Sequence, residues 1–306
     1  MPNILIISSA NMDFVMPMAS LPARGQTVIE SGAYRYVPGG KGANSAVAVA
    51  RLGGDCTFCA KLGRDDNGDA LAALYEREGI DCRALCRSED APTGLAAILV
   101  ESDGSNRIVV YPGANMTLTE GDIDRALDTA PDALYLQLEI SHAAVLYAAK
   151  SAAARGIPVF MDAGPADAAF PLEQLPPLVL FSPNETEAEI FTSICPDSED
   201  ACLACVEALT KRIKSAYIVL KLGSRGAYLY DTDKKAGTIL PSLPVKAVDT
   251  TAAGDAFTAA LTLHYLQTGD MTAAVRYANA VGALTVSRAG ASSSLPTKDE
   301  VESFLK

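Results

Sequence analysis

Asp249-Thr250-Thr251-Ala252-Ala253-Gly254-Asp255 leads directly into Ala256-Phe257-Thr258-Ala259-Ala260-Leu261, and the fold is organised around this stretch. Before it, Val245–Val248 alternates and contains β-branched residues, which predicts the end of a strand. After it, the residues are small and apolar without a helix breaker, which predicts a helix that begins near Ala252 and runs past Leu261. The sequence therefore predicts a strand, a tight turn and a helix.

The predicted turn is suited to an anion. Ala252, Ala253 and Gly254 have almost no side chains, so a ligand can reach the backbone N–H groups of the first helical turn, where the helix dipole favours negative charge. Asp255, in the same turn, would repel phosphate but can accept a hydroxyl proton. This pairing indicates phosphoryl transfer to an alcohol; the alternative is that Asp255 only complements the helix dipole.

Length and charge limit the class of protein. The 306 residues suffice for one large α/β domain or two small ones. A formal net charge of −12 without a Lys/Arg cluster argues against a nucleic-acid surface. No apolar run reaches the ~18 residues of a membrane span, and Pro2–Ser9 lacks the basic flank and cleavage site of a signal peptide. We expect a cytoplasmic protein that binds neither nucleic acid nor membrane.

Seven cysteines include two C-x-x-C pairs, Cys56/Cys59 and Cys202/Cys205. The first pair lies in a predicted strand, where positions i and i+3 point to opposite faces, and neither pair has the glycine-rich context of a zinc site. We expect reduced thiols rather than a metal centre.

Strands and helices alternate along most of the chain. Ile4–Ile7 is typical of a buried parallel strand, and the alternation from Thr57 onward predicts a doubly wound, mainly parallel sheet with helices on both faces. Short antiparallel strands, among them Thr27–Glu30 and a hairpin with its turn at 102–105, interrupt this pattern. We expect a single α/β domain over residues 1–306, with a discontinuous β lid at approximately 13–37 and 93–112.

Polar residues follow the first strand and precede the first helix. Asn11 and Asp13 offer an amide and a carboxylate to adjacent sugar hydroxyls, although an Asx turn explains them equally well. In Pro38–Asn44, three glycines allow close approach of a ligand, and Lys41 and Asn44 add a cation and an amide. This loop is not a P-loop, because no G-K-[ST] ends it.

Four more loops follow predicted core elements. Glu139 comes after an apolar run, Asn184 and Glu187 lie three apart at a helix start, Gly223–Gly226 joins two strands, and Ser287–Ser294 is a polar loop. Glu187 can also be a simple capping residue, and the two glycines a simple turn.

Together these stretches resemble the PfkB-type carbohydrate kinases and, within them, the ribokinases, over essentially the whole chain. Gly39–Asn44, with Gly53 and Gly63, resembles the first family signature, and Asp249–Asp255 the second. The resemblance implies a ribokinase-like fold, a homodimer formed through the lid, and phosphorylation of D-ribose by ATP to D-ribose 5-phosphate.

The resemblance also implies roles for individual residues. Asp255 matches the general base, and Ala252, Ala253 and Gly254 match the anion hole. Sugar-contacting positions are Asn11, Asp13, Gly40, Lys41, Asn44 and Glu139. Nucleotide positions are Asn184, Gly223, Ser224, Arg225, Gly226, Gly254 and Asn279. Glu187 matches a water-mediated Mg²⁺ position. A monovalent-cation (K⁺) site matches Asp249, Thr251, Thr285, Arg288, Gly290 and Ser294.

Two features depart from the wider family. Ala252-Ala253-Gly254 stands where many relatives have Gly-Ala-Gly, and this form resembles the ribokinases in particular. Met12, Met16 and Met18 leave room for a different sugar, because Met packs adaptably. The alternatives are a nucleoside or other sugar kinase and a non-catalytic sugar-binding regulator. A dinucleotide-dependent oxidoreductase is disfavoured because Ser8–Asn11, rather than G-x-G-x-x-G, follows the first strand.

Overall fold

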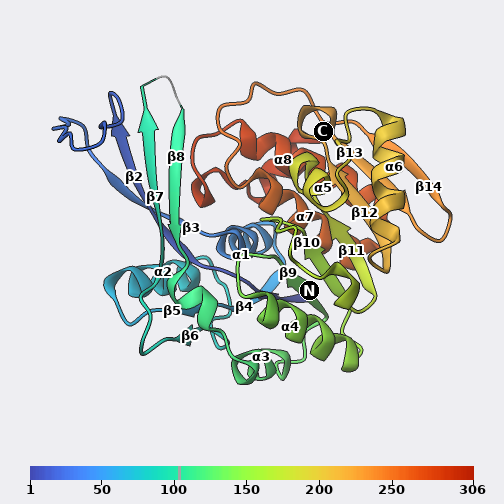
Figure 1. The fold of residues 1–306 in the computed structure, drawn as a ribbon. Coiled ribbons are helices and arrows are strands. Elements are labelled where there is room, and N and C mark those ends of the chain that lie inside the picture. Colours follow the sequence, from blue (N-terminus) through green and yellow to red (C-terminus); the bar gives the residue numbers. More distant parts are fainter. Residues whose placement is uncertain (103–104) are drawn as a thin grey trace.

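A computed structural model describes residues 1–102 and 105–306, so the hairpin turn expected at 102–105 lies partly outside the described residues. Within them, the central sheet has eight strands (Figure 1). Their order across the sheet is β14 (Ala236–Leu240), β13 (Ala227–Asp231), β12 (Ser215–Lys221), β11 (Leu178–Ser182), β10 (Val159–Asp162), β9 (Ala133–Leu136), β1 (Asn3–Ile7) and β4 (Asp55–Cys59). Neighbours from β12 to β4 are parallel, whereas β13 and β14 are antiparallel additions.

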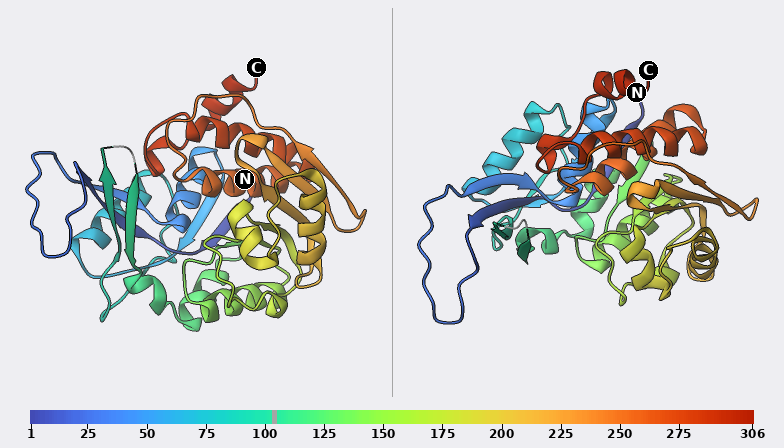
Figure 2. Two further views of the ribbon diagram at one scale, coloured as in Figure 1. Left: turned by 45° about the horizontal axis from the view of Figure 1, so that its top comes forward. Right: turned by 90° about the horizontal axis from the view of Figure 1, so that it is seen from above.

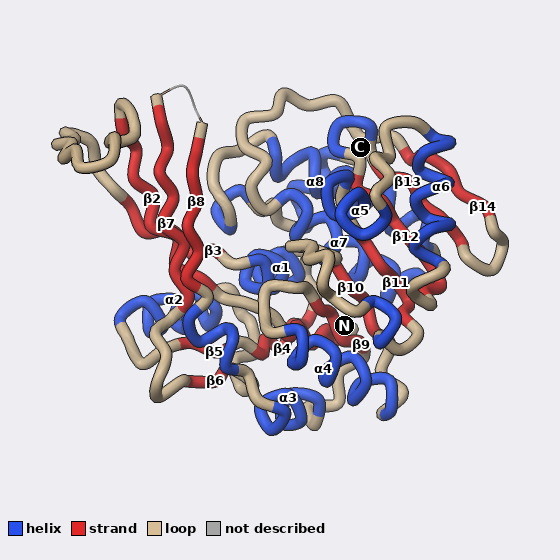
Figure 3. Tube along the Cα trace, in the orientation of Figure 1, coloured by secondary structure: helices blue, strands red, loops and turns tan. Residues whose placement is uncertain are grey.

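Helices cover both faces of this sheet (Figures 2 and 3). Successive side chains of its strands point to opposite faces, and each face is buried in its own hydrophobic core. Ile4 and Ile6 of β1 face one core, and Leu5 and Ile7 face the other. The first core contains residues of α1 (Lys41–Arg51), α2 (Asp66–Arg77), α7 (Ala253–Thr268), α8 (Met271–Val286) and α9 (Lys298–Phe304). The second contains residues of α3 (Glu120–Leu127), α4 (His142–Ala154), α5 (Glu185–Thr192) and α6 (Glu199–Thr210). The predicted doubly wound α/β fold is confirmed.

A second sheet stands to one side of this body, at the left of Figures 1 and 2. It contains β3 (Arg35–Gly39), β2 (Asn11–Met18), β7 (Gly94–Glu101) and β8 (Asn106–Tyr111) in that order. A short pair, β5 (Lys61–Leu62) and β6 (Cys86–Arg87), and four 3₁₀ turns complete the described elements; the turns are η1 (Gly113–Thr117), η2 (Leu172–Gln174), η3 (Gly223–Arg225) and η4 (Ser292–Ser294). We call the four-stranded sheet the lid.

Two predicted strands are wrong. Val245–Val248 lies in a loop between β14 and α7, and the N–H of Val248 donates to the carbonyl of Val286 rather than to a strand. Thr27–Glu30 lies in the exposed connection between β2 and β3, where Ile29 is 94% exposed. In both segments the β-branched residues have no strand beside them in the described structure. Their strand propensity alone therefore does not make them part of a sheet.

Within the described residues, no helix combines the length and apolarity required to cross a membrane.

Candidate active site

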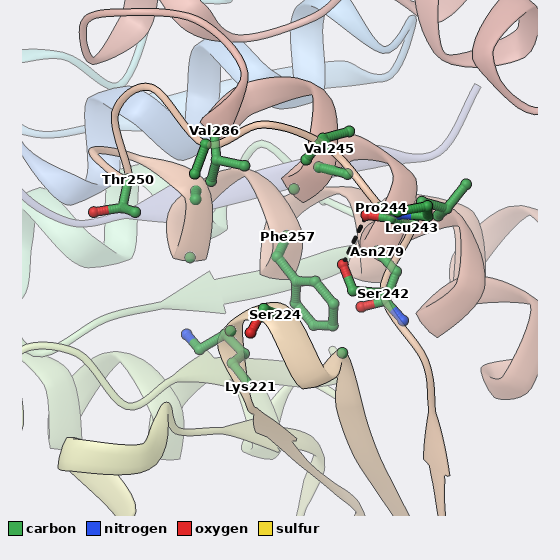
Figure 4. Close-up of a pocket in the computed structure, with 17 residues that line it drawn as sticks. Lys221, Ser224, Ser242, Leu243, Pro244, Val245, Thr250, Phe257, Asn279 and Val286 are labelled. Atoms are coloured by element: carbon green, nitrogen blue, oxygen red, sulfur yellow. Dashed lines mark hydrogen bonds between the residues drawn. The ribbon is translucent and has the colours of Figure 1, made fainter.

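Two cavities of about 460 Å³ each lie beside the N-terminus of α7. The first, which we call the polar cavity, is lined by five carboxylates and two ammonium groups: Asp13, Glu139, Asp162, Glu187, Asp255, Lys41 and Lys221. The second, the apolar cavity (Figure 4), is lined mainly by aliphatic groups and Phe257. Lys221, Thr250 and Gly254 line both, so the two cavities meet at the first turn of α7.

Asp255 is a buried carboxylate at this junction. Its Oδ2 accepts a hydrogen bond from Asn44 Nδ2 at 2.9 Å, and its Oδ1 lies 3.7 Å from Lys41 Nζ and 3.4 Å from Gln137 Nε2. Its exposure is 5%. The charge of Asp255 raises the pKa of Lys41 above its ordinary value, so this lysine carries a full positive charge. Three polar side chains, those of Asn44, Lys41 and Gln137, thus hold one carboxylate that lines the polar cavity.

The start of α7 has donors without acceptors. Ala252 adopts a left-handed conformation with φ of 63°, and the N–H of Ala253 donates to the carbonyl of Thr250 at 3.3 Å. Among the described residues, no group accepts from the N–H of Gly254 or Asp255. Such groups, with the helix dipole, form an anion site. Of the three residues expected to form the anion hole, Ala252 and Gly254 line the polar cavity and Ala253 lines the apolar one.

The glycine loop before α1 brings its residues to the same cavity. Gly40 has φ of 91°, and a Cβ there would lie 2.7 Å from the backbone N of Asn11, so only glycine fits. The N–H of Lys41 donates to Glu139 Oε2 at 2.9 Å, which places that carboxylate at the N-terminus of α1. Glu139 also accepts from Ser9 Oγ.

Asn11 and Asp13 begin β2 and line the polar cavity. Asn115 Nδ2 donates to Asn11 Oδ1 at 2.7 Å, which leaves the Asn11 amide nitrogen as the free donor. Burial, with a contribution from Glu139, raises the pKa of Asp13 to about 7. Asn44 Oδ1 is buried without a hydrogen-bond partner in the described structure, so an acceptor is available in the cavity wall.

Asn184 and Glu187 form a capping box at the start of α5. Asn184 Oδ1 accepts from the N–H of Glu187, and Glu187 Oε2 accepts from the N–H of Asn184, both at 2.8 Å. Both residues also line the polar cavity. Burial raises the pKa of Glu187, and the charge of Lys221 partly offsets this. Glu187 therefore caps α5, as the alternative interpretation expected, and it also lines the cavity.

The apolar cavity receives most of the expected nucleotide positions. Gly223, Ser224 and Gly226 line it, as does Asn279, whose Nδ2 donates to the carbonyls of Leu240 at 3.0 Å and Pro241 at 3.1 Å. Arg225 is not part of its lining: its guanidinium bonds the carboxylate of Glu185 and the carbonyls of Pro196 and Asp197.

Of the expected cation positions, only Thr251 belongs to a cavity lining. Asp249 joins the two loops: it accepts from Thr251 N and Oγ1 and, at 2.9 Å, from the N–H of Gly290. Burial alone would raise the pKa of Asp249, but the hydrogen bonds from Thr251 and Gly290 have the larger combined effect. The pKa of Asp249 is therefore lowered. Arg288 turns away to Glu300, and the hydroxyls of Thr285 and Ser294 bond local carbonyls.

Sequence reasoning missed four buried polar residues around the site: Asn115, Gln137, Asp162 and Lys221. Asp162 and Lys221 end β10 and β12, and Gln137 directly follows β9. Each of these three residues interrupts or ends an apolar run at the carboxyl end of a predicted strand, which is the same signal that identified Glu139. Asn115 lies in the 3₁₀ turn η1 and has no such signal.

The seven cysteines are free, and the described residues contain no group of three or more His, Cys, Asp or Glu side chains arranged to hold a metal.

Comparison with known proteins agrees with the geometry. Residues 1–298 match the pfkB family of carbohydrate kinases. The chain is 34% identical to the ribokinase of Staphylococcus aureus (strain COL) over 302 residues, or 97% of this chain and 98% of that protein. It is 32% identical to the deoxyribokinase of Salmonella typhi over 305 residues, with 99% and 98% covered. The structure of Arabidopsis thaliana ribokinase complexed with ribose and ATP superposes with a TM-score of 0.91 at 29% identity, and covers 100% of this chain and 99% of that one.

Proposed function

The chain belongs to the pfkB family of carbohydrate kinases, and on this premise we propose that it is a ribokinase, which transfers the γ-phosphoryl group of ATP to the primary hydroxyl of D-ribose. One observation carries the proposal: a polar and an apolar cavity of equal volume meet at Gly254, beside the buried carboxylate of Asp255.

The sugar occupies the polar cavity in this proposal. Asp13 and the free Asn44 Oδ1 accept from sugar hydroxyls, and the Asn11 amide nitrogen donates to one. A site with such groups rejects analogues that lack a hydroxyl, because its own polar atoms are then left unpaired.

ATP occupies the apolar cavity, with its base between Phe257 and the aliphatic wall and its phosphates toward Gly254. Asp255 takes the proton of the attacking hydroxyl, and the N–H groups of Gly254 and Asp255 bind the transferring phosphoryl group. Positioning and charge stabilisation supply most of the rate in such transfers, and both are built into this junction.

Mg²⁺ fits the donor set of the polar cavity, where Glu187 presents a carboxylate and phosphate oxygens would complete the ligands together with water. The metal would neutralise phosphate charge. K⁺ fits beside the anion hole, because Asp249 is held as an anion between two loops rich in carbonyl and hydroxyl oxygens.

A homodimer through the lid is part of the proposal, and so is a cytoplasmic location, where ATP is available. Ile98, Ile108 and Val110 of the lid face the polar cavity, while Val109 and Tyr111 are 51% and 64% exposed on a sheet whose edge strand is β8. Exposed apolar strands are liabilities unless they are covered. Sedimentation at micromolar concentration that finds only monomer would contradict the dimer.

The test is ATP consumption over a panel of D-ribose, 2-deoxy-D-ribose, hexoses and nucleosides. We expect the highest kcat/KM for D-ribose. Deoxyribose is the informative competitor, because a curated relative of similar identity is a deoxyribokinase. A nucleoside with a higher kcat/KM than ribose would refute the ribokinase assignment and leave a kinase; sugar binding without any turnover would indicate a regulator.

A further inference from the structure

We propose that Lys221 is a second phosphate-binding cation of this enzyme, which contacts the transferred phosphoryl group directly and is held in place by Asp162 and Thr258. The inference rests on the proposed phosphoryl transfer from the apolar to the polar cavity, and it assigns a catalytic role to a side chain that the sequence motifs do not contain.

The position of Lys221 supports this role. It is the last residue of β12, its side chain is 10% exposed, and it lines both cavities. A Cβ on Gly254 would lie 3.6 Å from Lys221 Nζ, which places the ammonium group beside the first turn of α7. Figure 4 shows Lys221 next to Ser224, below Phe257 in this view. Among the described residues, Lys221 is the only charged group in that lining.

The charge balance indicates why a second cation is needed. Five carboxylates and two ammonium groups line the polar cavity, so the protein alone presents an excess of negative charge to the phosphates of ATP. Lys41 lies 3.7 Å from Asp255, and its charge serves the base. Lys221 is the other cation, and it borders the cavity from which the phosphoryl group must come.

Its neighbours hold the ammonium group rigidly. Lys221 Nζ lies 2.5 Å from Asp162 Oδ2, which also accepts from Thr258 Oγ1 at 2.5 Å. Thr258 Oγ1 also lies 3.2 Å from the carbonyl oxygen of Gly254, so the same unit contacts the first turn of α7. A preorganised cation beside the free N–H groups stabilises developing charge without reorganising during the reaction.

A purely structural ion pair is the competing explanation. Asp162 has other donors, since its Oδ1 accepts from the N–H of Gly164 at 3.0 Å and its Oδ2 from Thr258. A buried pair with only a structural role can often be replaced on both sides by neutral groups without loss of stability. Neutralising both Asp162 and Lys221 therefore separates the two explanations. Loss of a structural ion pair alone would leave the turnover rate unchanged, whereas loss of a phosphate contact would lower it.

The experiment compares Asp162→Asn with Asp162→Asn/Lys221→Met, using D-ribose, Mg²⁺ and ATP. We expect the double variant to melt close to the single variant and to have a kcat about 10²-fold lower, the loss typical of removing one charge-stabilising donor. Calorimetric affinity for β,γ-methylene ATP should fall about tenfold, and affinity for ADP should change less than about threefold, because only the former has the γ-phosphate.

Lys221→Gln is the second variant, because its amide can still donate to Asp162. If only one of Asp162→Asn/Lys221→Met and Lys221→Gln folds, the same measurements on that variant test the inference. A folded variant with kcat within about threefold of its parent, or with equal losses in affinity for both nucleotides, overturns the inference and leaves the kinase function intact. Absence of turnover by the wild-type protein on every sugar would instead refute the proposed function itself.

Discussion

The polar and apolar cavities have the same volume but opposite chemistry. The polar cavity draws charged side chains from loops and strand ends spread over the chain, from Asp13 to Asp255, whereas the apolar cavity offers aliphatic groups, Phe257 and loop backbone, with Lys221 as its one charge in the described lining. Selectivity in the first depends on pairing every hydroxyl, and binding in the second depends mainly on shape. We therefore expect phosphoryl transfer at the residues that line both cavities. The following variants test whether the two cavities have separate roles.

The largest effect is expected for Asp255→Asn. The amide keeps the shape of the side chain but cannot take the hydroxyl proton, so kcat should fall by about 10³-fold. Calorimetry should still detect binding of ribose and ATP. Turnover near that of the wild-type protein would show that the base lies elsewhere.

Gly254→Ala tests the junction between the cavities. An added Cβ meets Lys221 only at 3.6 Å, an ordinary contact, so the fold should tolerate it. The methyl group would nevertheless stand in the path of the phosphoryl group, and we expect a loss of about 10²-fold in kcat from misplacement.

Gly121→Ala is the matched control, because Gly121 lies in α3, where the added Cβ has its nearest contact at 3.8 Å, away from both cavities. Equal activity of the two alanine variants would contradict a shared junction at Gly254.

Titration of Asp13 should affect the polar cavity alone. With a pKa of about 7, Asp13 gains a proton below neutral pH and loses its capacity to accept from two hydroxyls, so kcat/KM for ribose should fall about tenfold per pH unit below 7. Asp13→Asn should remove this acid limb. An unchanged limb in that variant would assign it to another group.

The same raised pKa has a consequence for stability. The folded protein holds this proton more tightly than the unfolded chain, so its contribution to the free energy of unfolding is lost as pH rises from about 4 to 7. At pH 8, Asp13→Asn should therefore melt above the wild-type protein; a lower melting temperature would count against burial as the cause.

Asn115→Asp tests how the sugar-binding amide is oriented. The carboxylate cannot donate to Asn11 Oδ1 or to the carbonyl of Ala10, so the Asn11 amide should flip and present the wrong atom to the sugar. We expect KM for ribose to rise several-fold and KM for ATP to stay constant. A rise in both would indicate general loss of structure.

The smallest effect is expected for the monovalent cation. Replacing a bulky organic cation by K⁺ at equal ionic strength should raise kcat, since an ion beside Asp249 would stiffen the start of α7. Identical rates in the two salts would contradict a functional monovalent-cation site beside Asp249.

The sequence predicted the fold and most of the polar cavity, because glycine loops, strand ends and the Asp249–Asp255 turn have local signatures. It failed at Val245–Val248, where alternation predicts a strand but no partner strand is within reach in the described structure. It also missed Lys221 and Asp162, whose pairing joins residues 59 positions apart and is set by sheet order rather than by local pattern.

A crystal structure of the ternary complex with D-ribose, Mg²⁺ and β,γ-methylene ATP would show whether sugar and nucleotide occupy the two cavities and meet at Gly254. We expect the primary hydroxyl of ribose within about 3 Å of the Asp255 carboxylate, and the γ-phosphate between that hydroxyl and the N–H of Gly254. A nucleotide outside the apolar cavity, or a sugar that turns its primary hydroxyl away from Asp255, would contradict this arrangement.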